Sequence, residues 1–250
     1  NSNGSIRMIY DGTSVHNNGE SSTDRQYGTS QFNPNYNNNM YVGYMYTSGE
    51  AHGTGTSSTI KTNVDKFYTD KLSSYASKLD TNAGFCGDRS NLNGQSGVGT
   101  GTVTTYNKGY LRVVESAPTL TCENASDYYT VASASSGNKK LSYPIGLITA
   151  DEMMLAGHAG GVFDGTYNHV KTNNGSYLVT GNSFWTMTPA GGYPPFGGDW
   201  WDVDVFHDHG SGNFDDNNAH HTSGLRPVIN LKSDVTITGS GTMTDPYVVA

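Results

Sequence analysis

The chain has 250 residues, of which 34% are hydrophobic and only 14% are charged, and its formal net charge is −8. This length can bury one substantial core, and the 17 Tyr and 8 Phe exclude a disordered chain, because disordered chains are poor in aromatic residues. The negative charge, with no basic cluster larger than Lys139-Lys140, argues against nucleic-acid binding, which depends on neutralising phosphates.

No apolar stretch approaches the length of a membrane span. The sequence starts abruptly at Asn1 without a visible signal peptide, so we expect that any leader or membrane anchor has been removed. The high content of Gly, Asn, Ser and Thr is typical of turn-rich and strand-rich extracellular domains.

The N-terminal part, residues 1–140, carries the main predicted helix. Short apolar runs at 6–10 and 40–46 predict strands. Between 58 and 80, apolar residues recur at three- and four-residue steps, which predicts a helix with one buried face. The run 110–114 predicts a further strand.

The C-terminal part, residues 141–250, begins with a shorter predicted helix. Thr149 and Glu152 form a capping box at its start, and Gly157 ends it. Strands follow at 177–180, 184–188, 201–206, 225–231, 235–237 and 247–249. Two helices, many short strands and no strand–helix–strand rhythm predict a single α+β domain over 1–250, with short antiparallel sheets and long loops.

The two cysteines, Cys86 and Cys122, permit one disulfide. It would close a loop of about 36 residues and contribute up to ~4 kcal/mol in the chain-entropy model. The alternative is a pair of free thiols.

One segment differs from the rest of the chain: between Lys171 and Arg226 there is no Lys, Arg or Glu, but there are six Asp, four His and many aromatic residues. Aromatic side chains give large contact area at low entropic cost, and small polar residues give adaptable hydrogen bonds. This composition indicates a recognition surface. Arg226, the first positive charge after it, is expected to anchor a buried carboxylate or backbone carbonyls.

The run 201–206 alternates with period two. Trp201, Val203 and Val205 are expected to face the core, so that Asp202, Asp204 and Phe206 face solvent. An exposed aromatic set rimmed by carboxylates and imidazoles is a plausible ligand face. The predicted ligand-binding residues are Tyr193, Phe196, Asp199, Asp202, Asp204, Phe206, His207, Asp208, Phe214, Asp216, Asn217, Asn218, His220 and His221.

Three alternatives to this ligand face stay open. Asp and Asn also favour turns for local reasons, so these residues could be ordinary solvated turn formers. The pattern His207-Asp208-His209 and the pair His220-His221 could bind zinc or another transition metal, since His-x-His on a strand places both rings on one face. The run 215–218 could bind calcium through oxygen atoms, although its spacing is not that of an EF-hand.

Four stretches together resemble a known family: FCGDRS at 85–90, YPIGLITADEMMLAG at 143–157, SYLVTGNSFWTMTP at 176–189 and GLRPVINLKSDVTITGSGTMTDPYVV at 224–249. They are similar to surface proteins of gut Firmicutes that carry a pilin-like anchor. The sequence also resembles the C-type-lectin-like fold shared with formylglycine-generating enzymes, which includes the variable proteins of diversity-generating retroelements.

In those variable proteins, adenines in asparagine-type codons are randomised near the C-terminus. Such randomisation cannot produce Lys, Glu, Gln, Met or Trp, and residues 190–224 contain none of the first four. The resemblance therefore implies a diversified region in which Trp200 and Trp201 belong to the constant framework. It also implies that the late aromatic segment is the recognition surface.

We therefore expect an extracellular, non-catalytic binding protein, displayed on a bacterial surface, that recognises a protein or glycan at a cell or phage surface. No nucleic acid is expected as partner, and a membrane only through a missing N-terminal anchor. No cofactor is expected, apart from a possible structural calcium. The sequence contains no G-x-S-x-G or H-E-x-x-H motif, which argues against an enzyme. The alternative is a structural minor pilin or filament subunit.

Overall fold

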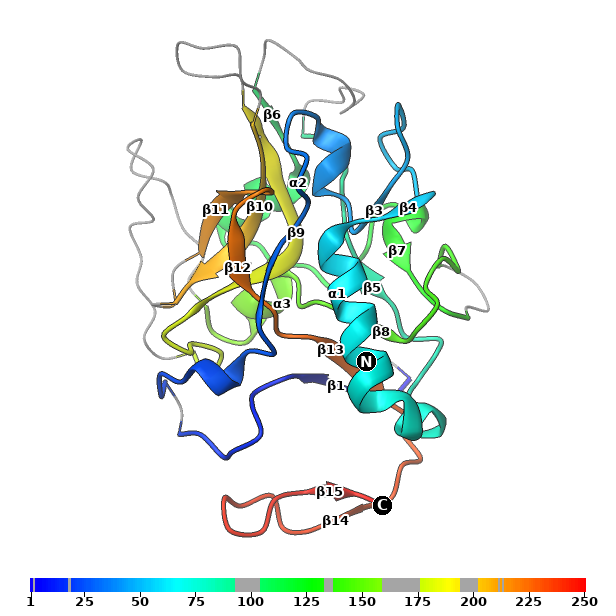
Figure 1. Ribbon diagram of the computed structural model, residues 1–250, viewed down its shortest axis with the longest axis vertical. Helices are drawn as coiled ribbons and strands as arrows, with labels where there is room; N and C mark the ends of the chain where they lie inside the picture. Colours follow the sequence, from blue (N-terminus) through cyan, green and yellow to red (C-terminus); the bar gives the residue numbers. More distant parts are fainter. Residues whose placement is uncertain are drawn as a thin grey trace.

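The computed structural model describes residues 1, 3–17, 19–92, 104–132, 137–158, 176–193, 202–210, 212 and 214–250. It confirms the α+β class: the described residues form three α-helices and several small, mainly antiparallel sheets (Figure 1). No helix in these ranges is both long and apolar enough to span a membrane.

The largest sheet is built around β9, an eleven-residue strand that crosses the middle of the molecule (Figure 1). The strand order is β11-β10-β9-β12-β2, and β6 also pairs with β9. All these pairs are antiparallel except β12 with β9. The strands are β2 (Thr29–Gln31), β6 (Thr105–Tyr106), β9 (Ser183–Tyr193), β10 (Asp202–His209), β11 (Phe214–Asn218) and β12 (Thr222–Gly224).

A second sheet joins distant parts of the chain in the order β1-β13-β8. It consists of β1 (Ile6–Ile9), β8 (Ile145–Gly146) and β13 (Val228–Leu231). Three two-stranded pairs complete the β-structure: β3 (Met45–Tyr46) with β4 (Thr56–Ser57), β5 (Phe85–Cys86) with β7 (Tyr128–Tyr129), and β14 (Ile237–Thr238) with β15 (Val248–Val249). The last pair forms a hairpin below the rest of the molecule in Figure 1.

The helices confirm two predictions and correct one. The predicted helix at 58–80 is α1 (Thr59–Phe67), capped by Ser58 and continued by a π-turn (Tyr68–Leu72) and a 3₁₀ turn (Ser73–Lys78). The capping box of Thr149 and Glu152 is present at α3 (Ala150–Leu155). The run 110–114, predicted as a strand, is helical and belongs to α2 (Lys108–Glu115).

Other boundaries also differ from the predictions. Of the strand predicted at 40–46, only β3 (Met45–Tyr46) is a strand, and the run begins in a 3₁₀ turn (Asn39–Val42). Further 3₁₀ turns lie at Thr23–Arg25 and Ala125–Asp127. The run 177–180 is not a strand, and the strand predicted from 225 begins at Val228.

The core lies between α1 and the large sheet. Ile60 and Val64 of α1 are fully buried, as are Phe184, Trp185 and Met187 of β9. The sequence pattern predicted this apolar helix face. The buried indole nitrogen of Trp185 donates a hydrogen bond to the carbonyl of Ser30 at 2.7 Å. This bond fixes β9 to β2 of the same sheet.

Covalent and ionic links hold the loop-rich parts. Cys86 and Cys122 form the predicted disulfide. Arg226 is buried, as expected, and donates hydrogen bonds to the carbonyls of Tyr10 and Leu178 and to the carboxylate of Asp11. These contacts join the N-terminal segment to the end of the large sheet.

Candidate functional site

The predicted ligand face lies on β10 and β11, and their pairing decides which side chains share a side. Phe206 is opposite Asp216, and Asp204 is opposite Asn218. Because side chains alternate along a strand, Asp202, Asp204, Phe206, Phe214, Asp216 and Asn218 are on one side of this two-stranded ribbon. Val203, Val205, His207, His209, Asp215 and Asn217 are on the other.

The prediction that Phe206 and Phe214 face solvent is wrong. Their exposed fractions are 0% and 1%, and their ring centroids lie 6.1 Å apart in an edge-to-face arrangement. Tyr110 of α2 stacks at 6.3 Å from Phe206, and His158 lies 5.3 Å from Phe214. Tyr110 and His158 cover the two rings, which belong to the hydrophobic core. Val203 and Val205 are buried as predicted.

His207 and Asp208 are also buried rather than exposed. A carboxylate oxygen of Asp208 lies 2.9 Å from Nε2 of His158, whose Nδ1 lies 2.9 Å from the hydroxyl of Ser176. The second carboxylate oxygen of Asp208 accepts a hydrogen bond from the amide of Gly210. Ser176 is 1% exposed, so its hydroxyl is out of reach of a substrate, and this chain of hydrogen bonds has a structural role.

The remaining described candidates form a polar rim along the edge strand β11 and the turn after it. Asp202 and Asp204 of β10 are partly exposed, as are Asp216, Asn217, Asn218 and His220, and His221 is exposed. The backbone of this rim is held by the buried strands beneath it, whereas its side chains reach solvent.

Two side-chain contacts order the turn. The ring of His220 lies 4.1 Å from the ring of Tyr36, and Nδ1 of His221 lies 2.6 Å from the side-chain oxygen of Asn217. Burial and the neighbouring His221 lower the pKa of His220, which favours a neutral imidazole there. This end of the rim is therefore aromatic and polar rather than charged.

Asp204 carries the strongest electrostatic signal of the site. Burial raises its pKa well above the usual value, and the carboxylates of Asp216, Asp202 and Asp215 raise it further. Among the described residues, its oxygen Oδ1 is buried and has no hydrogen-bond partner. Like charges this close oppose ionisation, and a buried carboxylate without a counterion is costly.

Tyrosines of another segment border this carboxylate cluster. The rings of Tyr106 and Tyr110 stack at 4.2 Å, and burial, Tyr106 and Asp216 raise the pKa of the Tyr110 phenol. These tyrosines and Tyr36 are not among the predicted site residues, because they are distant from the acidic segment in sequence. Tyr106 ends the short strand β6 and Tyr110 lies in α2, so no single periodic pattern in the sequence indicates that the two rings stack.

Several predicted positions lie outside the described residues. They are Phe196, Asp199, Trp200 and Trp201, together with the side chain of Tyr193, whose backbone ends β9. The part of the predicted face that the structure brings together is thus the rim from Asp202 to His221, without the buried Phe206, His207, Asp208 and Phe214.

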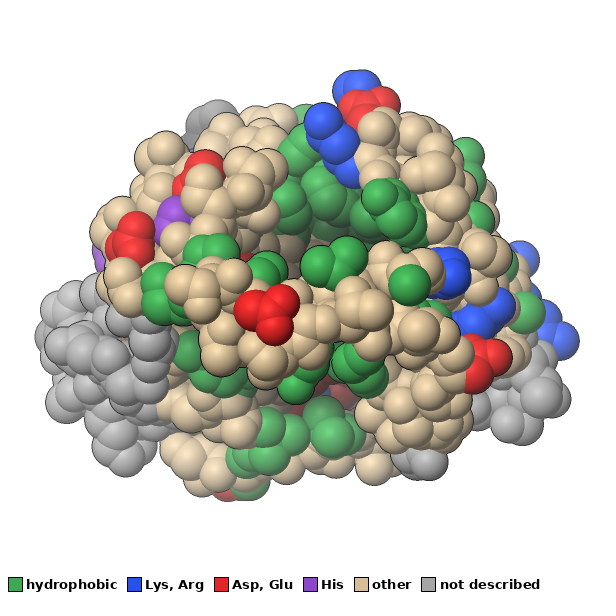
Figure 2. Space-filling model, turned by 90° about the horizontal axis from the view of Figure 1, so that it is seen from below, with side chains coloured by type: hydrophobic (Ala, Val, Ile, Leu, Met, Phe, Trp, Pro, Cys, Tyr) green, Lys and Arg blue, Asp and Glu red, His purple; other side chains and the backbone are tan. Residues whose placement is uncertain are grey.

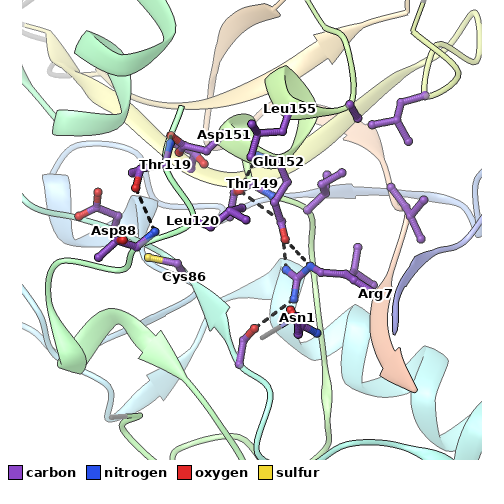
Figure 3. A pocket seen from close by; sticks show the side chains of 18 of the residues that line it. Asn1, Arg7, Cys86, Asp88, Thr119, Leu120, Thr149, Asp151, Glu152 and Leu155 are labelled. Atoms are coloured by element: carbon purple, nitrogen blue, oxygen red, sulfur yellow. Dashed lines mark hydrogen bonds and ion pairs between the residues drawn. The ribbon is translucent and has the colours of Figure 1, made fainter. Parts of the chain in front are cut away.

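A pocket of about 420 Å³ lies elsewhere, at β1 and α3 (Figure 3). Its charged groups bind one another: Arg7 pairs with Glu152, and Arg112 pairs with Asp88 and Asp151. In Figure 3, Arg7 and Glu152 point toward each other across the pocket.

The rim of this pocket is apolar and exposed. The exposed fractions are 73% for Leu120, 57% for Tyr177 and 56% for Leu155. Hydrophobic side chains also gather around hollows on the face seen from below in Figure 2. The charged groups of the pocket are therefore already paired with one another, and its exposed rim is apolar.

Comparisons with known proteins do not identify the chain. No family model, curated protein or solved structure matches it.

Proposed function

We propose that this protein is a non-catalytic extracellular binding protein that recognises a cationic or polar group of a protein or glycan partner through the polar rim of β10 and β11. The observation that carries the proposal is the carboxylate cluster around Asp204. Burial and the like charges of its neighbours raise the pKa of Asp204, and residues 172–225 contain no Lys or Arg. A positively charged ligand group would relieve this repulsion.

The architecture under the rim supports the proposal. Buried Val203, Val205, Phe206 and Phe214 fix the strands, while the exposed Asp, Asn and His side chains remain adaptable. A rigid scaffold with adaptable polar contacts lowers the entropic cost of binding. The resemblance to the C-type-lectin-like variable proteins supports the same reading, and the Cys86–Cys122 disulfide is typical of an oxidising, extracellular environment.

The proposal is tested with a fluorescein-labelled octalysine peptide, whose binding is followed by fluorescence anisotropy at low ionic strength. The double variant Asp202→Asn/Asp216→Asn should bind at least about tenfold more weakly, which corresponds to about 1.4 kcal/mol. The matched control, Glu115→Gln/Asp234→Asn, removes the same charge from exposed positions elsewhere. It should retain the affinity.

Two outcomes would contradict the proposal. Equal weakening by both double variants would assign the attraction to the net charge of −8 and not to the rim. Absence of octalysine binding by the folded wild-type chain would exclude a cationic ligand at the cluster.

The proposed variability of residues 190–224 has a separate test in the neighbouring DNA. We expect a near-copy of these codons that differs only at adenines, beside a reverse-transcriptase gene. A locus without such a copy would contradict diversification of residues 190–224, and the protein would then be a binding protein of constant sequence.

A second candidate function, a structural subunit of a filament, is favoured by the C-terminal hairpin. Met243, Tyr247 and Val248 are 57%, 63% and 56% exposed, and an isolated two-stranded hairpin is only marginally stable in water. Covering these side chains by another subunit would stabilise it. Electron microscopy of the purified protein discriminates: filaments favour this function, and monomers favour the binding protein.

A further inference from the structure

Three potential metal ligands meet on the side of the β10–β11 ribbon opposite Asp204. His207 and His209 are two residues apart on β10, so their rings share a side of the strand. Asp215 of β11 is the direct cross-strand partner of His207. The strand register thus brings two imidazoles and one carboxylate together without any contribution from a loop.

The distances fit a site that needs only small side-chain adjustments. One carboxylate oxygen of Asp215 lies 3.9 Å from Nε2 of His207 and 3.5 Å from Nδ1 of His209. One ligand atom from each of the three side chains falls within 4.8 Å of the others. In a tetrahedral zinc site with bonds near 2.0–2.1 Å, ligand atoms are about 3.3–3.4 Å apart.

A second contact orients His207 for this role. Its Nδ1 lies 3.4 Å from the hydroxyl of Ser223, and its ring lies 5.6 Å from the ring of Trp185. A metal-binding histidine commonly has its other ring nitrogen held by such a partner, which fixes the tautomer and the ring orientation. Here that arrangement leaves Nε2 directed toward Asp215.

The exposure of the three residues also suits a metal centre. His207 is buried and anchors one side, Asp215 is partly exposed, and the side chain of His209 is 62% exposed. Solvent therefore reaches the site past His209. Two imidazoles favour zinc or a similar transition metal over calcium, which prefers oxygen ligands.

We propose that His207, His209 and Asp215 bind a divalent transition-metal ion, with Zn²⁺ the best match, and leave one position open for water or for a donor atom of a ligand. The simpler alternative is that the two histidines only form ion pairs with Asp215. The three ligands lie on the side of the ribbon opposite Asp204, and they can bind a metal whether or not a cation is recognised at the rim. Asp215 also contributes to the carboxylate cluster around Asp204.

The test is isothermal titration of ZnCl₂ into the full chain after removal of metal with EDTA. Both cysteines are in the disulfide, so thiolates do not compete. We expect one zinc ion per chain and at least a tenfold loss of affinity in His209→Ala and in Asp215→Asn. Ser223→Ala should weaken binding by about 10- to 100-fold, as expected for loss of an orienting partner.

The control is His221→Ala, which removes an exposed imidazole that contacts Asn217 instead. It should leave zinc affinity unchanged. Cobalt provides an independent readout, since Co²⁺ in a four-coordinate site gives intense visible absorption that His209→Ala should abolish.

Weakening by His221→Ala equal to that by His209→Ala would show nonspecific histidine binding and overturn the proposal. Absence of zinc binding by the folded wild-type chain would do the same. Because His209 is exposed, far-UV circular dichroism of His209→Ala should match the wild type. A His209→Ala variant that stays folded and binds zinc with unchanged affinity would also exclude the site.

Discussion

Two aspartates of this protein, Asp127 and Asp204, have pKa shifts in opposite directions. Asp127 is fully buried and accepts hydrogen bonds from the backbone amide, Nε and a terminal nitrogen of Arg89, and it also contacts His52. Burial opposes its ionisation, but His52 and Arg89 outweigh that effect and its pKa is lowered. For Asp204, by contrast, burial and the neighbouring carboxylates act in the same direction, and its pKa is raised.

The contrast indicates a structural role for Asp127 and a role in recognition for the cluster around Asp204. The Asp127–Arg89 pair fixes β7 against the loop after β5 and leaves no charge for a ligand. Burial and the neighbouring carboxylates both oppose ionisation of Asp204, so the cluster lowers stability at neutral pH. Because the cluster lowers the stability of the fold, we infer that it serves ligand binding rather than folding. This is the physical basis of the proposed recognition surface.

The largest predicted effect breaks the paired carboxylate. Asp127→Ala leaves the guanidinium of Arg89 buried without its counterion, and removal of one partner from a buried ion pair costs about 3–5 kcal/mol. Urea unfolding should show this loss. Glu123→Ala is the control: its exposed pair with Lys108 should contribute at most about 1 kcal/mol. Similar losses in both variants would mean that burial does not distinguish the two pairs.

The second prediction concerns the scaffold beneath the rim. Phe206→Ala removes a fully buried ring, and such truncations cost about 3–5 kcal/mol. We expect a value near 3 kcal/mol, because β11 is an edge strand and can move toward the cavity. Thermal unfolding should detect the change, and His221→Ala should leave the melting temperature within about 1 °C of the wild type. An unchanged melting temperature in Phe206→Ala would contradict a core position for this ring and would support its place on the binding face.

These two regions also show what the sequence could predict. The start of α3 is set by a local capping box, and the burial of Val203 and Val205 follows from alternation along one strand, so both were predicted. The opposite side of β10 depends on α2, which lies about 90 residues earlier in the chain. Because the pattern at 110–114 predicts a strand, nothing in the sequence indicates that Tyr110 of a helix stacks on Phe206.

The polar part of the site was only partly predictable for a related reason. Composition identified the acidic segment, and the His-x-His spacing indicated that two rings share a side. The pairing of His207 with Asp215 depends on the register between β10 and β11, which a five-residue polar strand does not reveal. Sequence spacing thus gave two of the three ligands of the proposed metal site.

The smallest predicted effect is a gain in stability at Asp204, whose oxygen Oδ1 has no hydrogen-bond partner among the described residues. A carboxyl whose pKa is raised in the folded state binds its proton more tightly there than in the unfolded chain. Stability is therefore lost as pH rises above about 4, through the raised folded value. Asp204→Asn keeps the shape and removes the charge. It should raise stability at pH 7 by about 1 kcal/mol, or about 2–4 °C in melting temperature.

The pH dependence distinguishes this explanation from a general effect of substitution. At pH 3 the carboxyl of Asp204 is protonated in both folded and unfolded chains, so Asp204→Asn and the wild type should melt at nearly the same temperature. The difference should then grow as pH increases. Asp234→Asn, at an exposed position, should follow the wild type throughout. A gain of equal size at pH 3 and pH 7 would show that ionisation of Asp204 is not its cause. That result would contradict the proposal that the acidic cluster binds a cation.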